Sequence, residues 1–93
     1  MNFEEKDKPL IKSISSNIIR AERVEDDTSK IGYLAEIVKE SFSFGILLKN
    51  RGDFNHSKEY IETAVNCNKI LRDILQREYD SVFVSFHMEE DKK

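Results

Sequence analysis

The sequence has little of what builds disulfide frameworks, tight turns or short elements. Its 93 residues include no tryptophan, one cysteine, one proline and three glycines. A single cysteine excludes an internal disulfide framework and is typical of a reducing compartment. Few prolines and glycines mean few turns, so the chain should consist of a small number of long elements. We therefore expect an all-α fold, a bundle of three to four helices.

Long apolar runs and a strong charge of one sign are also absent. No stretch approaches the 18 or so apolar residues that span a membrane, and the start, MNFEEKDKPLIK, does not resemble a signal peptide. Fifteen Lys and Arg stand against 18 Asp and Glu, which gives a net charge of −3. This balance argues against a nucleic acid or a membrane as the main partner. We predict a cytoplasmic protein that forms one domain over residues 1–93, with frayed ends at 1–8 and 88–93.

Apolar residues recur at three- and four-residue steps in three segments, and each pattern predicts an amphipathic helix. The predicted helices cover residues 9–24, 29–50 and 55–79. In residues 80–87, Val82, Val84 and Phe86 alternate as in a strand. A helical phase is kept by Tyr79, Val82, Phe83 and Phe86. Because a lone strand would have no partner edge, we expect the third helix to continue to about residue 87.

The break NRGDFN separates the second and third predicted helices. Gly52 follows the end of the second helix, where a residue with positive φ stops a helix without steric cost. Asn55 is the expected N-cap of the third helix, with Asp53 as the alternative, and Asp27 or Thr28 is expected to cap the second. A short break makes the two helices antiparallel. Gly45 is then expected to face Ala64, so that the helices approach closely.

The stretch FGILLKNRGDFNHSKEYIETA resembles a tetratricopeptide repeat, and the resemblance covers about residues 41–73. The matching positions are Phe44, Gly45, Leu48, Gly52, Asp53, Phe54, Ser57, Ile61 and Ala64. It implies a tight antiparallel hairpin whose small and bulky residues lock together, in a family that binds peptides or proteins. The chain holds no second copy, whereas an array needs about three repeats. The GDF turn also resembles those of microtubule-interacting and trafficking domains and of translin-like chains.

Residues for chemistry are few. Cys67 lies among apolar residues, which indicates a buried structural thiol, and no histidine close in sequence would activate it. His56 and His87 are isolated imidazoles without further ligands at metal-binding spacing. The three glycines do not form a phosphate-binding loop. We expect no catalytic residues, no metal site and no cofactor.

One motif supports an alternative. RGDFNH, from Arg51 to His56, resembles the arginine and histidine signature of HEPN-type ribonucleases. In that family the arginine stabilises phosphate charge and the histidine serves the chemistry of the 2′-hydroxyl. The simpler interpretation is a basic residue at the end of one helix and a polar residue in the first turn of the next. A small ribonuclease, or a toxin or antitoxin component, is the alternative function.

The sequence has more aromatic residues than a small helical core is expected to bury. A three-helix core of this size should not hide all of them, so another surface must cover some. The segment after residue 78 is the most crowded, and we predict that Tyr79, Phe83 and Phe86 bind a partner. The leading hypothesis is a non-enzymatic protein-interaction module, an adaptor or chaperone-like protein, that forms a homodimer.

Overall fold

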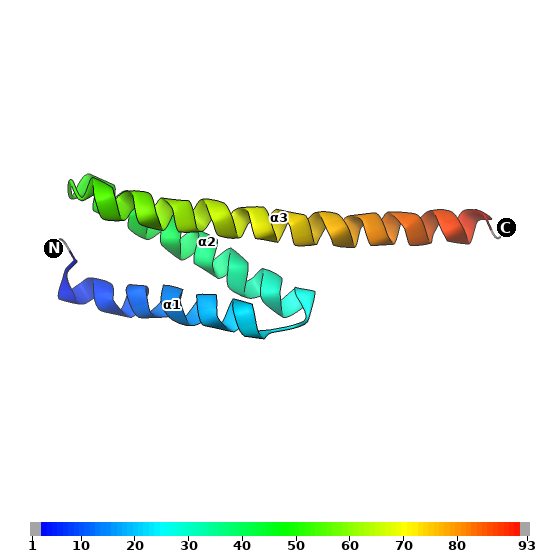
Figure 1. The fold of residues 1–93 in the computed structure, drawn as a ribbon, viewed down its shortest axis with the longest axis horizontal. Helices are drawn as coiled ribbons and strands as arrows, with labels where there is room; N and C mark the ends of the chain where they lie inside the picture. The colour runs from blue at the N-terminus through cyan, green and yellow to red at the C-terminus, as the bar shows by residue number, and fades with distance from the viewer. Residues whose placement is uncertain (1–2, 92–93) are drawn as a thin grey trace.

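The computed structural model describes residues 3–91, and within them every regular element is helical. A 3₁₀ turn, η1 (Glu5–Asp7), leads into α1 (Lys8–Arg23), which is followed by α2 (Asp27–Asn50) and α3 (Phe54–Asp91). Figure 1 shows α2 running back from the end of α1 and α3 returning along α2 and continuing past it. The all-α prediction is confirmed, and residues 80–87 are helix rather than strand.

The helices do not form a closed bundle. Both α1 and α3 pack on α2, whereas their backbones do not pack on each other. The principal extents are 64 × 22 × 14 Å and the radius of gyration is 17.6 Å. A compact chain of this length would have a radius of gyration of about 12 Å. The difference comes from α3, whose C-terminal part extends beyond the other two helices (Figure 1).

The core consists of two clusters of buried side chains between the helices. The first, nearer the interhelical turn of α2 and α3, is built from Ile14, Phe44 and Leu48, with Phe3, Leu10, Ile11, Ile18 and Tyr60 against it. The second, toward the start of α2, is built from Ala21, Leu34, Ile37 and Ile74, with Ile18, Ile31, Tyr33, Cys67 and Leu71 against it. Ile18 belongs to both clusters, so the core is continuous along α2.

Gly52 ends α2 as the sequence predicts. Its φ is +85°, the left-handed conformation that glycine adopts without strain. The Gly52 amide donates to the Lys49 carbonyl at 3.0 Å, and the Asp53 amide donates to the Leu48 carbonyl at 2.9 Å. These bonds satisfy carbonyl groups that the end of the helix leaves without partners. The chain can therefore reverse within three residues.

Gly45 lies where α2 and α3 approach closely, but the residues nearest to it are Ile61 and Ser57 rather than Ala64. A Cβ atom at Gly45 would lie 2.5 Å from Ile61 Cγ1 and 3.3 Å from the Ser57 carbonyl oxygen. The Ser57 hydroxyl donates to the Gly45 carbonyl at 2.7 Å. The expected facing residue was wrong because Ala64 lies twelve residues after Gly52, too far along α3, whereas Ser57 lies five residues after it and contacts Gly45.

The N-cap of α2 differs from the prediction, whereas that of α3 is the alternative that the sequence offered. Asp26, rather than Asp27 or Thr28, caps α2 and accepts the Ser29 amide at 2.8 Å. At α3 the predicted alternative, Asp53, accepts the His56 amide at 3.2 Å. Helix α2 begins earlier than its apolar pattern does, because its first turn, residues 27–30, is polar and adds nothing to the pattern.

We predicted frayed ends at 1–8 and 88–93, and this stays a prediction. In the described chain η1 is joined to the α2–α3 turn through the bond between Asp7 and Arg51, and α3 runs to Asp91. The remaining residues of those two predictions, 1–2 and 92–93, lie outside the described residues.

Candidate functional site

The candidate interaction surface begins where α3 leaves α2. Arg77 Nη2 donates to both carboxylate oxygens of Asp27, at 2.9 Å each. A hydrogen bond with Asp27 raises the pKa of the adjacent Glu78 carboxyl group. Beyond Glu78, among the described residues, no hydrogen bond or ion pair that involves a side chain joins α3 to another helix. We call residues 79–89 the projecting segment, and each of them is exposed.

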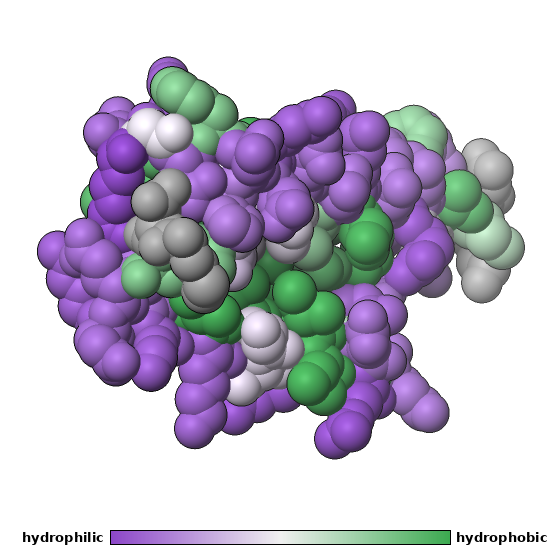
Figure 2. Space-filling view, turned by 60° about the vertical axis from the view of Figure 1, so that its left-hand side comes forward, coloured by the Kyte–Doolittle hydropathy of each residue, from purple (hydrophilic) through white to green (hydrophobic). Residues whose placement is uncertain are grey.

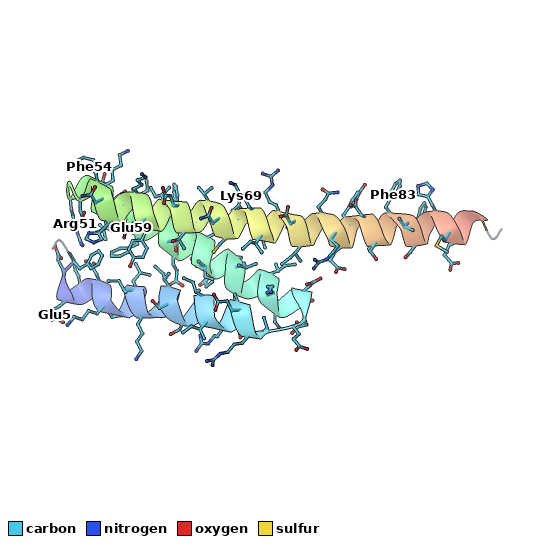
Figure 3. The ribbon with its side chains drawn as sticks, in the orientation of Figure 1. Glu5, Arg51, Phe54, Glu59, Lys69 and Phe83 are labelled. Atoms are coloured by element: carbon cyan, nitrogen blue, oxygen red, sulfur yellow. The ribbon has the colours of Figure 1, made fainter. Side chains whose placement is uncertain are left out.

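The three predicted partner-binding residues all lie on the projecting segment. Tyr79 is 62% exposed, Phe83 51% and Phe86 58%. Figure 3 shows Phe83 on the part of α3 beyond α2, at the opposite end of the molecule from Arg51. The exposed apolar side chains beside them are Leu75, Val82, Val84 and Met88. Their role in binding stays a prediction, but no helix of the described chain covers them.

Leu75 and Ile74 are adjacent apolar residues of α3, but their exposure differs. Ile74 is buried, whereas Leu75 is half exposed. The two helices cross, so that α2 covers the Ile74 side of α3 near residue 74 and leaves the Leu75 side uncovered. Apolar spacing along one helix does not show where its neighbour crosses, so the sequence could not separate these two residues.

Within the projecting segment, rings contact one another along one side of the helix. The Tyr79 and Phe83 rings are stacked with their centroids 6.2 Å apart, and the Phe83 and His87 rings meet edge-on at 4.2 Å. Residues four apart are neighbours on a helix surface, and such pairs contribute a few tenths of a kcal/mol each, about 0.2–0.5. The stacking orders these rings but does not remove them from water.

Arg51, the first residue of the ribonuclease-like motif, is held by the N-terminal segment. Its Nη1 donates to Asp7 Oδ2 at 2.6 Å and its Nη2 to Asp7 Oδ1 at 3.2 Å, and Nη2 also lies 3.6 Å from Glu4 Oε2. The hydrogen bond from Arg51, together with the bond from the Glu4 amide, lowers the pKa of Asp7. The Asp7 side chain is 4% exposed and that of Arg51 is 17%. The pair therefore joins the start of the chain to the α2–α3 turn.

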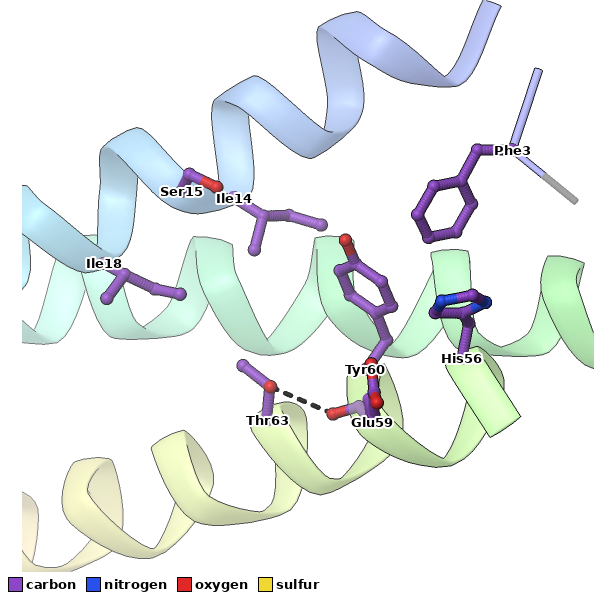
Figure 4. A pocket seen from close by; sticks show the side chains of 8 residues that line it. All are labelled: Phe3, Ile14, Ser15, Ile18, His56, Glu59, Tyr60 and Thr63. Carbon is purple, nitrogen blue, oxygen red and sulfur yellow. Dashed lines mark hydrogen bonds between the residues drawn. The ribbon is translucent and has the colours of Figure 1, made fainter. Parts of the chain in front are cut away.

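His56, the second residue of that motif, belongs to a different group of contacts. Its Nδ1 lies 2.7 Å from Asp53 Oδ2, and its ring centroid is 4.6 Å from that of Phe3. Figure 4 shows His56 beside Phe3, with Tyr60 on the next turn of α3. These residues line a cavity of about 400 Å³ between α1 and α3, with Ile14, Ser15, Ile18, Glu59 and Thr63.

A second, more apolar cavity of about 150 Å³ lies among α1, α2 and α3. Its lining is Ile18, Ala21, Glu22, Lys30, Leu34, Ile37, Cys67 and Ile70. Figure 2 shows hydrophobic surface in the middle of a face whose surroundings are hydrophilic. Cys67 is half buried here, and burial raises the pKa of its thiol. A raised pKa lowers the thiolate fraction, which supports a structural role for Cys67.

Two other classes of feature, metal sites and membrane-spanning helices, are absent from the described residues. Within residues 3–91, no three His, Cys, Asp or Glu side chains gather as a metal ion would require. No helix in this range combines the length and apolarity needed to cross a bilayer.

Comparison with protein-family models, with curated proteins and with solved structures finds no match.

Proposed function

We propose that this protein is a non-enzymatic helical interaction module that self-associates through the projecting segment and the adjacent Leu75. The observation that carries the proposal is the row of exposed apolar and aromatic side chains on a stretch of α3 that no other described helix covers. Monomeric proteins rarely expose a continuous apolar surface of this kind unless it binds something. Aromatic side chains are also the residues that most often anchor protein interfaces.

The total surface area supports the same proposal. The chain exposes 6877 Å², whereas a compact monomer of its mass would expose about 5600 Å². The excess of roughly 1300 Å² is larger than the area of about 800 Å² that each partner contributes to a standard interface. Covering the projecting segment would therefore bring the exposed area close to that of a compact protein.

Helix stability supports it as well. An isolated helix shorter than about 12–15 residues is marginal in water, because packing supplies most of the stability of a helix in a protein. The projecting segment is such a short stretch, and it depends on the packed part of α3 for its nucleus. A partner that packs on its apolar side would supply the missing tertiary contacts. The tetratricopeptide-like hairpin, also part of the proposal, would serve as the rigid base.

Sedimentation equilibrium of the parent and of the Phe83→Ser, Phe86→Ser double variant tests the proposal. Burying a phenylalanine contributes about 1.5–3 kcal/mol, so several in one interface support a micromolar Kd after the cost of association. We expect the parent to be a dimer at about 100 µM, well above such a Kd. We expect the double variant to sediment as a monomer with an unchanged far-UV circular dichroism spectrum.

The Phe42→Ser, Phe54→Ser double variant is the matched control. Phe42 and Phe54 are 52% and 67% exposed, and both lie outside the projecting segment. We expect this control to dimerise like the parent. A monomeric parent, or a dimer that only the control variant dissociates, would contradict the proposal.

The alternative, a HEPN-like ribonuclease, requires Arg51 and His56 to act together on RNA. Their contacts favour structural roles, since Asp7 holds the Arg51 guanidinium and Asp53 binds the His56 ring. We expect no RNA cleavage by the parent. RNA cleavage that is lost in both Arg51→Ala and His56→Ala would establish the alternative instead.

A further inference from the structure

The outer part of α3 carries one continuous stripe that no described helix covers. Leu75, Tyr79, Val82 and Phe86 recur at steps of four, three and four residues, the spacing of a seam between two packed helices. One step before Leu75 on the same side is Arg72, and one step after Phe86 is Glu89. Both charged side chains are exposed. The stripe thus has an apolar centre, a cation at one end and an anion at the other.

We propose that two copies of this chain pair antiparallel along this stripe, with Leu75 opposite Phe86 and Tyr79 opposite Val82 of the second copy. The inference rests on the proposed function, and it adds the partner's identity, orientation and register. In this register every apolar member of the stripe meets an apolar member of the other copy. Phe83, stacked on Tyr79, flanks the seam. The interface is isologous, as in most homodimers.

Charge decides the orientation. In the antiparallel register, Arg72 of each copy lies opposite Glu89 of the other, which gives an ion pair at both ends of the seam. A parallel pair would place Arg72 against Arg72 and Glu89 against Glu89. Like charges on facing helices repel each other, and so do the macrodipoles of two helices that lie side by side in the same direction. The same stripe is therefore self-complementary only when the second copy runs in the opposite direction.

The fold leaves room for the second helix and offers no substitute from its own chain. Because α3 is one continuous helix, the projecting segment cannot fold back onto α1 or α2. The cavities between α1 and α3 are lined by a different side of α3, that of His56, Tyr60, Cys67 and Ile70. Near residue 75, the side of α3 that carries the stripe is uncovered, because α2 packs on the side that carries Ile74.

Disulfide cross-linking tests the register in a chain whose own thiol is removed by Cys67→Ser. Leu75→Cys and Phe86→Cys are made separately, mixed and oxidised at a concentration at which the parent is dimeric. We expect the mixture to give a covalent dimer with one chain of each kind, faster than either chain alone. Two Leu75→Cys side chains in this register lie about 16 Å apart along the seam, since a helix rises 1.5 Å per residue. A disulfide needs Cα atoms within about 7 Å.

Charge reversal tests the ends of the seam without touching its apolar centre. We expect Arg72→Glu and Glu89→Arg each to raise the dimer Kd about tenfold, because each places like charges together at both ends. The double variant, Arg72→Glu with Glu89→Arg, restores both pairs, so its Kd should return to within about threefold of the parent value. Lys58→Glu is the matched control, since Lys58 is exposed on α3 but lies outside the seam, and its Kd should equal that of the parent.

The outcomes separate this inference from the proposed function. A monomeric parent would overturn both. A dimer in which Leu75→Cys cross-links to itself as fast as the mixture would overturn the antiparallel register alone. A charge-swapped double variant that dimerises no better than the two single variants would do the same.

Discussion

The two ends of α3 behave differently although they belong to one continuous helix. From Phe54 to Glu78 the helix packs on α2, and one side of it is buried at Ser57, Ala64 and Ile74. From residue 79 to residue 89 every side chain is exposed, including two phenylalanines and a tyrosine. Local sequence does not create this difference, because both parts have helical phase and apolar stripes. The length of the neighbouring helix does, since α2 begins at Asp27, opposite Arg77.

This comparison shows that phenylalanine has two different roles in this protein. Phe44 is fully buried and contacts the rings of Phe3 and Tyr60, so it holds the three helices together. Phe83 is half exposed, and among the described residues its ring meets the rings of Tyr79 and His87 on its own helix. Substitutions in the packed part should therefore change the free energy of unfolding, and substitutions in the projecting segment should change association.

The largest expected effect is that of Phe44→Ala. Removing a buried phenylalanine ring costs about 3–5 kcal/mol in the free energy of unfolding, because it loses apolar burial and leaves a cavity. Phe83→Ala should change the unfolding of the monomer by less than about 0.5 kcal/mol. Urea denaturation below the dimer Kd measures both. Equal losses in the two variants would show that the projecting segment is packed within the monomer.

The next effect concerns the close approach at Gly45. Gly45→Leu should lower the free energy of unfolding by about 1–3 kcal/mol or more, because its Cβ alone would collide with Ile61. Gly32→Ala is the matched control, since Gly32 is exposed in α2 with no atom within 4 Å of an added Cβ. Alanine is the better helix former by up to about 1 kcal/mol, so this control should raise the stability. If Gly45→Leu melts like the parent, the helices do not need glycine to approach.

A smaller effect is expected at the ion pair between Asp7 and Arg51. The folded state lowers the pKa of Asp7 below its ordinary value of 3.8. The stabilisation from this carboxylate is therefore present above pH 3.8 and is lost as the pH falls through the lower pKa of the folded state. Thermal melts should show that Arg51→Ala lowers the melting temperature at pH 7, with a difference that shrinks toward pH 2. A difference that does not depend on pH would mean that Asp7 does not partner Arg51.

The smallest effect on the monomer should follow from ending the chain after Glu78. We expect the shortened chain to unfold in urea with a free energy within about 0.5 kcal/mol of that of the monomeric parent, because no core residue is removed. It should also fail to dimerise in sedimentation equilibrium. A large loss of stability would erase the distinction between the two parts of α3.

The sequence predicted the long elements well and the contacts between them poorly. Helical periodicity and the scarcity of glycine located all three helices, and Gly52 identified the turn. Gly45 was assigned the wrong partner, because a helix pattern does not give the register of its neighbour. For the same reason the pattern did not separate exposed Leu75 from buried Ile74, since their difference depends on where α2 crosses α3.

The candidate site was predicted to a similar degree. Tyr79, Phe83 and Phe86 stood out because the sequence had more aromatic residues than a small core can bury, and all three are exposed. The contact between Arg51 and Asp7 could not be predicted, because it joins residues far apart in the chain and follows no motif. The side-chain pair of Asp53 and His56 was also missed, although Asp53 was already an alternative cap and a cap brings the third residue after it within reach.

The attachment of the N-terminal segment at the α2–α3 turn has a consequence for folding order. Asp7 and Arg51 are separated by 44 positions, whereas Ser57 and Gly45, which join the hairpin, are separated by 12. Because short loops close at a smaller entropic cost, the hairpin should form first and α1 should dock last. By the same reasoning α1 should open before the hairpin does, with faster amide hydrogen exchange in α1 than in the buried part of α2. Local opening would then bare Phe44 and Tyr60 while the hairpin stays folded.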